Sequence, residues 1–135
     1  MIVLEGEYIF DHTMHPPLIV DRKDPKWFLL ERVLAIVSDR RTHQEFSKYE
    51  ITPIKNATAA LKIAIVAMFF SVHYSFVVQE LMNRRKLRKF MNIDEVPSAE
   101  AVYKFLSKFD DSKFMSLVSG ILNSHCKWRR KHGVN

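Results

Sequence analysis

Five basic residues fall within one short stretch near the middle of the chain: Arg84, Arg85, Lys86, Arg88 and Lys89. Arg and Lys side chains bind phosphate oxygens, so the run favours contact with the backbone of a nucleic acid. The alternative is a solvated helix face that binds nothing. Lys104 and Lys108, four residues apart on the next predicted helix, shift our interpretation toward DNA.

The helix predicted to open at Ser98 carries polar side chains opposite its apolar stripe, which consists of Ala101, Val102, Phe105 and Phe109. Ser and Lys can reach phosphates or base edges, and Glu can accept a hydrogen bond from cytosine. Capping of the helix explains Ser98 equally well, and simple exposure to solvent explains the others. The candidates for contact in a DNA groove are Ser98, Glu100, Tyr103, Lys104, Ser107 and Lys108.

The last candidates lie in the sequence CKWRRKHGVN, where cations surround Trp128. Arg129 and Arg130 suit contact with a DNA backbone, and a solubilising tail explains them at least as well. No convergent set of catalytic residues is visible, so we expect no enzyme activity and no cofactor. His12 and His15, or His125 beside Cys126, lack a second pair at zinc spacing, so we expect no metal site.

Composition restricts the fold and the setting. Of 135 residues, 47% are hydrophobic and only three are Gly, which favours a helical core. The net charge is about −1 over residues 1–55, +4 over 56–109 and +3 over 110–135, so the excess lies after residue 55. A basic surface suits nucleic acid or an anionic membrane. The single Cys126 fits a reducing, cytoplasmic setting.

Hydrophobic periodicity predicts an all-α bundle that positions these residues. Residues 1–24 read as an irregular arm with short strands as an option, residues 25–125 as a helical DNA-binding domain, and residues 126–135 as a basic, frayed tail. The apolar window 57–72 contains Lys62 and is shorter than the roughly 20 residues that a bilayer needs, so it predicts a buried helix and no membrane partner. The expected helices are 25–40, 57–72, a shorter one capped by Ser75, the basic run to Met91, one from Ser98 to Phe109, and one capped by Asp110-Asp111. The apolar side is expected to consist of Leu87, Phe90 and Met91 in the basic run, and of Phe114, Leu117, Val118, Ile121 and Leu122 in the last helix.

The basic run, a turn at 92–97 containing Pro97, and the helix at Ser98 follow one another in the order of a helix-turn-helix-like unit. From Ala57 to Asn123 the chain also resembles the amino-terminal, transposase-associated domain of DDE-type insertion-sequence transposases. The matching segments are ALKIAIVAMFF, SFVVQELMNRRKLRKFMNI and DEVPSAEAVYKFLSKF, and LRKFMNIDEVPSAEAVYKFLSKF is the most specific. The resemblance covers about half of the chain.

This resemblance implies binding of double-stranded DNA at the terminal inverted repeats of an insertion element, with a second copy or a full-length transposase as a further partner. In such transposases catalysis belongs to a following RNase-H-like domain with three acidic metal ligands. The sequence ends at Asn135, close to where that domain would begin, so we expect an amino-terminal fragment without catalysis. The alternative is an all-helical interaction module that does not bind DNA, with the helix at 57–72 and a Met-rich surface as its interface.

Overall fold

The computed structural model describes residues 15–37, 44–45, 47–48 and 57–131, with side chains for all of these except Asp111 and residues 124–131. As the sequence predicts, the secondary structure of this part is helical, and the short strands left as an option for residues 1–24 are not present in residues 15–24. Residues 44, 45, 47 and 48 are helical. The longer helices are α1 (Pro25–Ile36), α3 (Ala57–Phe70), α4 (Tyr74–Asn83), α5 (Arg85–Met91), α6 (Ala99–Leu106) and α7 (Asp111–Lys131).

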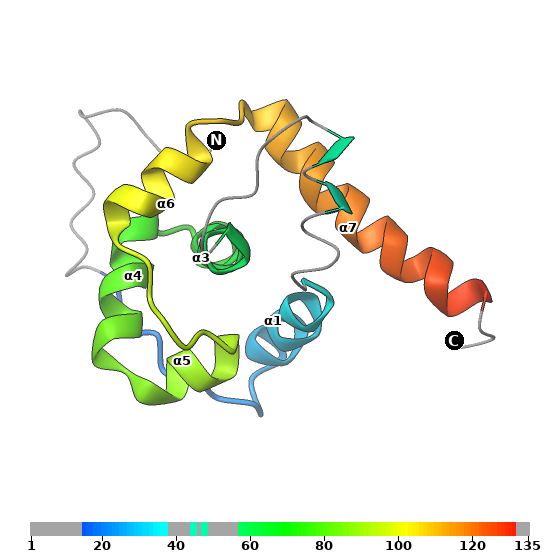
Figure 1. Ribbon diagram of the computed structural model, residues 1–135. Helices are drawn as coiled ribbons and strands as arrows, with labels where there is room; N and C mark the ends of the chain where they lie inside the picture. The colour runs from blue at the N-terminus through cyan, green and yellow to red at the C-terminus, as the bar shows by residue number, and fades with distance from the viewer. Residues whose placement is uncertain (1–14, 38–43, 46, 49–56, 132–135) are drawn as a thin grey trace.

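Helix α3 lies at the centre of the molecule, and the other helices surround it (Figure 1). It packs directly against α1, α4 and α6. Residues 60–67 of α3 are all buried, so apolar side chains are needed on nearly every side of this helix. The expectation that the segment at 57–72 forms a covered core helix is confirmed, with the helix ending at Phe70.

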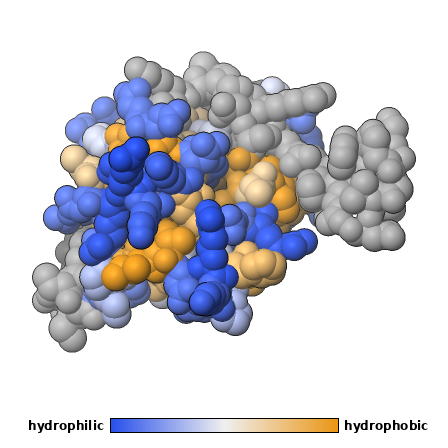
Figure 2. Space-filling model, turned by 90° about the horizontal axis from the view of Figure 1, so that it is seen from below, coloured by the Kyte–Doolittle hydropathy of each residue, from blue (hydrophilic) through white to orange (hydrophobic). Residues whose placement is uncertain are grey.

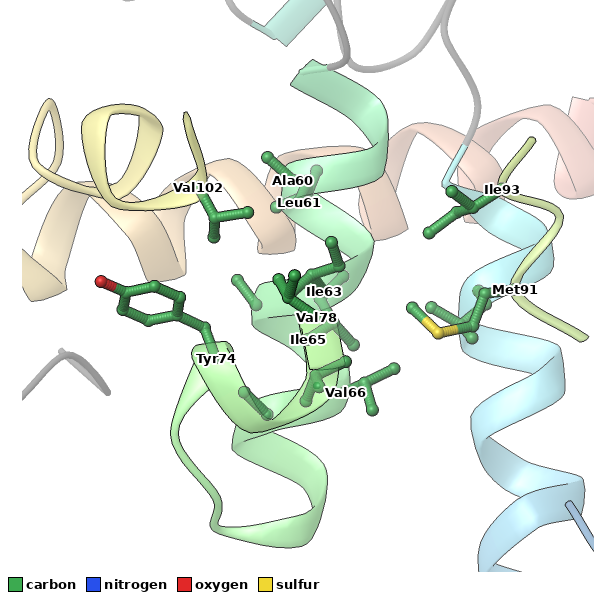
Figure 3. Packing of buried hydrophobic residues seen from close by; sticks show 14 of the residues in the cluster. Ala60, Leu61, Ile63, Ile65, Val66, Tyr74, Val78, Met91, Ile93 and Val102 are labelled. Carbon is green, nitrogen blue, oxygen red and sulfur yellow. The ribbon is translucent and has the colours of Figure 1, made fainter. Parts of the chain in front are cut away.

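Residues on several helices close the core around α3. Val102 of α6 and Tyr74 of α4 lie on one side of it, and Met91 and Ile93 lie on the other (Figure 3). The buried Lys62 of α3 donates a hydrogen bond from Nζ to the Met91 carbonyl oxygen, at 3.0 Å. A cation suits this place because the C-terminal end of a helix, here α5, is partly negative.

Within the described residues, no single helix is long and apolar enough to cross a membrane. Helices α3 and α4 reach that length and composition only when taken together. The chain bends by 109° between them.

The start of α1 agrees with the prediction, and the start of α4 does not. Asp24 caps α1 through a hydrogen bond from the Lys26 amide, and Pro25 is the first helical residue. Helix α1 ends at Ile36, and the predicted extension over 38–40 lies outside the described residues. Ser75 was expected to cap α4, but the cap is His73, whose Nδ1 accepts from the Ser75 amide.

Ser98 caps α6 as predicted, because its Oγ accepts a hydrogen bond from the Ala101 amide at 3.1 Å. The predicted apolar stripe needs one correction: Ala101 is exposed, while Leu106 is buried together with Val102 and Phe105. The helix ends at Leu106, before the predicted end at Phe109, and Phe109 is buried after the following turn.

Helix α7 is capped by Asp110, whose Oδ1 accepts from the Lys113 amide at 2.7 Å. Phe114, Leu117 and Ile121 face the core, as the spacing predicts. The helix continues to Lys131, through most of the segment predicted as a frayed tail, and its last turns project beyond the other helices (Figure 1).

Residues 15–24 contain neither helix nor strand, and the predicted arm from residue 1 to 14 lies outside the described residues. The described part is nevertheless packed against the bundle. Leu18 is 2% exposed, and the ring of His15 lies 5.3 Å from that of Phe76 in a T-shaped contact.

Candidate nucleic-acid interface

Helix α5 is fixed to the bundle by its apolar side. Leu87, Phe90 and Met91 are buried, as the sequence predicts. The ring of Phe90 meets Trp27 of α1 edge to face, with the two centroids 5.2 Å apart. Because the apolar side chains all point inward, the basic residues of this helix must lie on its flanks and its outer side.

Two arginines of the basic run form the joint between α4 and α5. Arg84 has an extended backbone between the helices, and its Nε donates to Glu80 Oε1 at 2.9 Å. The guanidinium of Arg88 reaches back to α4 and donates to the carbonyl oxygens of Leu81, at 2.6 Å, and Met82, at 3.2 Å. These carbonyls belong to the negative end of α4, so both arginines stabilise the fold.

The other three residues of the run have no such role. Arg85, Lys86 and Lys89 are exposed, and their side chains make no hydrogen bond or ion pair with another described residue. Their spacing of one, three and four residues places them on one side of a helix. Three cations on a fixed helix form a surface complementary to a row of phosphates. We call Arg85, Lys86 and Lys89 the α5 basic face.

Helix α1 and residues 15–24 contact the apolar side of α5 through Phe90. The guanidinium carbon of Arg22 lies 5.9 Å from the centroid of Phe90, and Lys26 Nζ lies 5.5 Å from that of Phe70. Arg22 is also paired with Glu31 at 3.3 Å, which offsets its charge. In the view from below, hydrophilic side chains alternate with apolar patches (Figure 2).

The predicted groove residues of α6 are exposed, as expected, but several are engaged within their own helix. Besides the capping by Ser98, Lys104 Nζ lies 3.3 Å from Glu100 Oε1, and Ser107 Oγ donates to the Lys104 carbonyl at 2.9 Å. Lys108 is exposed, and Tyr103 is half-exposed beside Tyr74. An exposed pair such as Glu100–Lys104 contributes little stability, so it can be broken by a ligand.

The structure does not bring the two candidate helices together as a packed pair. Helix α5 packs mainly on α1 and α4, whereas α6 packs mainly on α3 and α4. In Figure 1 the two lie at separate places around α3, with the chain from Asn92 to Ser98 running between them. That connection is longer than the usual three- or four-residue turn, and the helix-turn-helix-like unit is not confirmed.

The remaining candidates are on α7. Arg129 and Arg130 belong to the projecting end of this helix, and their side chains lie outside the described part of the structure. Among the described residues, no group of three or more His, Cys, Asp or Glu side chains is placed to hold a metal ion.

Sequence reasoning missed Glu80, the partner of Arg84. Its spacing gave a usable signal, because Glu followed four residues later by Arg forms an ion pair on one side of a helix. For Arg22 no comparable signal existed, since it meets Phe90 through tertiary folding between segments far apart in the chain.

Comparisons with models of known families, with curated proteins and with solved structures found no match for this chain.

Proposed function

We propose that this protein binds double-stranded DNA through the α5 basic face, with α6 as a second element that contacts the same duplex. The observation that carries the proposal is the exposure of Arg85, Lys86 and Lys89 on a helix whose position is fixed. Because the helix is already held by Arg84, Arg88 and its buried side, binding need not order it. The cost of placing three cations beside phosphates is therefore reduced.

The resemblance to transposase amino-terminal domains adds a more specific proposal, namely that the DNA consists of the terminal inverted repeats of an insertion element. Sequence recognition requires side chains that reach base edges. The residues available for that purpose are Tyr103 and Lys104 on α6, Lys108 in the turn after it, and Glu100 once its pair is broken.

The test is a fluorescence-anisotropy titration of a random-sequence duplex library at two salt concentrations, with sequencing of the bound fraction. Three phosphate contacts predict that the logarithm of the binding constant falls with the logarithm of salt with a slope of about −2.7, since each contact contributes about −0.9. An enriched motif among the bound duplexes would support the inverted-repeat proposal. The absence of binding at low salt would contradict DNA binding altogether.

A second candidate function is an interaction module, and exposed apolar residues on α1 favour it. Phe28 is 53% exposed and Leu29 is 54% exposed, and they are adjacent on the outer side of that helix. The previously expected interface at 57–72 does not fit, because most of α3 is buried inside the chain itself. Sedimentation velocity with and without duplex DNA separates the two functions. Self-association without any complex with DNA would favour the interaction module.

A further inference from the structure

Glu80 of α4 is a buried carboxylate beside the α5 basic face. The residue is 9% exposed, and a single oxygen, Oε1, accepts two hydrogen bonds. One comes from the Leu18 amide at 2.7 Å, and the other comes from Arg84 Nε at 2.9 Å. A buried carboxylate depends on such charge-assisted hydrogen bonds, because burial removes the water that would otherwise solvate it.

The contact with Glu80 determines what Arg84 can do. Arg84 adjoins Arg85 in sequence, and its side chain is 35% exposed, so it stands at the edge of the basic face. To donate to a phosphate with its Nε, it would have to leave Glu80. The buried carboxylate would then remain without its cationic partner, which is strongly unfavourable.

The same oxygen also holds residues 15–18 on the bundle. Leu18 is buried, and His15 packs against the rings of Phe70 and Phe76. Glu80 therefore has two bonds that support its position, one to the segment before α1 and one to the joint before α5. Pairing with Arg84 is accordingly part of the packed structure and not an exposed contact that a ligand displaces easily.

We propose that Glu80 withholds Arg84 from DNA and thereby limits the number of phosphates that the basic face neutralises. The carboxylate acts as an internal competitor of the phosphate oxygen for the same guanidinium group. This inference rests on the proposed function, since it specifies how the affinity of that DNA-binding surface is restrained.

The test is a double-mutant cycle with Glu80→Gln and Arg84→Gln, measured as the salt dependence of binding to one duplex. Gln at position 80 keeps an oxygen that can accept from Leu18 and lacks the charge that holds Arg84. We expect the slope of log binding constant against log salt to become steeper by about 0.9 in Glu80→Gln, the value for one added phosphate contact. Arg84→Gln alone leaves the slope unchanged, and the double variant returns it to the wild-type value.

Asp94→Asn is the matched control, because it removes one negative charge from an exposed residue that forms no ion pair with another described residue. An equal change in Asp94→Asn would show that net charge alone acts and would overturn the inference. A slope equal to that of the wild type in Glu80→Gln, measured while this variant still binds DNA, would also overturn the inference. If Glu80→Gln does not fold, as judged by circular dichroism, a shallower slope in Arg84→Gln would overturn it and an unchanged slope would support it. Failure of every protein, wild type included, to bind DNA at low salt would instead contradict the proposed function.

Discussion

Within the basic run, the use of each charge follows from the position of its residue around α5. Arg84 and Arg88 point toward α4, where Glu80 and the last carbonyl groups of that helix accept their hydrogen bonds. Arg85, Lys86 and Lys89 point to solvent. Five adjacent cations that look equivalent in the sequence thus divide into two that hold the fold and three that are available for a ligand.

A second residue with a distinctive environment is Tyr74, at the start of α4. Burial raises the pKa of its hydroxyl group above the ordinary value, and the neighbouring Tyr103 raises it further. When the pH rises above about 10, the ordinary pKa of tyrosine, the unfolded chain loses this proton while the folded chain retains it. The free energy of unfolding therefore falls with pH between the ordinary and the raised pKa.

Replacing Tyr74 with Phe should remove this dependence. Urea unfolding of both proteins from pH 8 to pH 11 checks it. Below about pH 10 the difference in unfolding free energy between them should be constant, and above it the wild type should lose stability relative to Tyr74→Phe. A difference that stays constant over the whole range would contradict the role assigned to Tyr74.

At the scale of elements, Gly120 shows how a tertiary contact can reverse an expectation from helix propensity. Gly inside α7 should cost about 1 kcal/mol relative to Ala. The Glu45 carboxylate lies directly against Gly120, however, with Cδ only 2.6 Å from where a Cβ atom would stand. Glu45 is buried and paired with Lys48 at 2.7 Å, so the absence of a side chain at 120 allows this contact.

We therefore expect Gly120→Ala to be coupled to Glu45. In the wild-type background the gain in helix propensity is cancelled or outweighed, because the buried carboxylate must move. In a Glu45→Ala background the same substitution should raise the free energy of unfolding by about 1 kcal/mol. Urea denaturation of the four proteins of the cycle measures the coupling. An equal gain in both backgrounds would show that the contact has no energetic consequence.

The contrast between local signals, such as helix propensity, and tertiary contacts, such as that of Glu45 with Gly120, explains how much could be predicted from the sequence. Periodicity and helix caps predicted α3, α5, α6 and α7 because these signals act within a few residues of the chain. The signals are the apolar run around Lys62, the stripe of Leu87, Phe90 and Met91, and the caps at Ser98 and Asp110. The candidate site was predicted as one stretch of charge. Its division into anchors and exposed cations was not predicted, because it depends on how α4 turns into α5 at Arg84.

For the whole molecule, the arrangement around α3 fixes α5 by contacts with α4 on one flank and α1 on the other. We propose that the α5 basic face contacts DNA and that net charge alone does not explain binding. Two variants of equal charge test this claim. Arg85, Lys86 and Lys89 are replaced with Gln in one variant. In the other, Gln replaces three exposed cations outside the proposed interface, namely Lys23, Arg32 and Lys113.

The most direct measurement is the anisotropy titration of one duplex by the wild type and these two variants over a range of salt concentrations. The α5 variant should lose about 2.7 from the magnitude of the slope, or about 0.9 for each of three contacts, while the control variant keeps most of the wild-type slope. Equal losses in both variants, or an unchanged slope in the α5 variant, would contradict the claim that this face binds the DNA backbone.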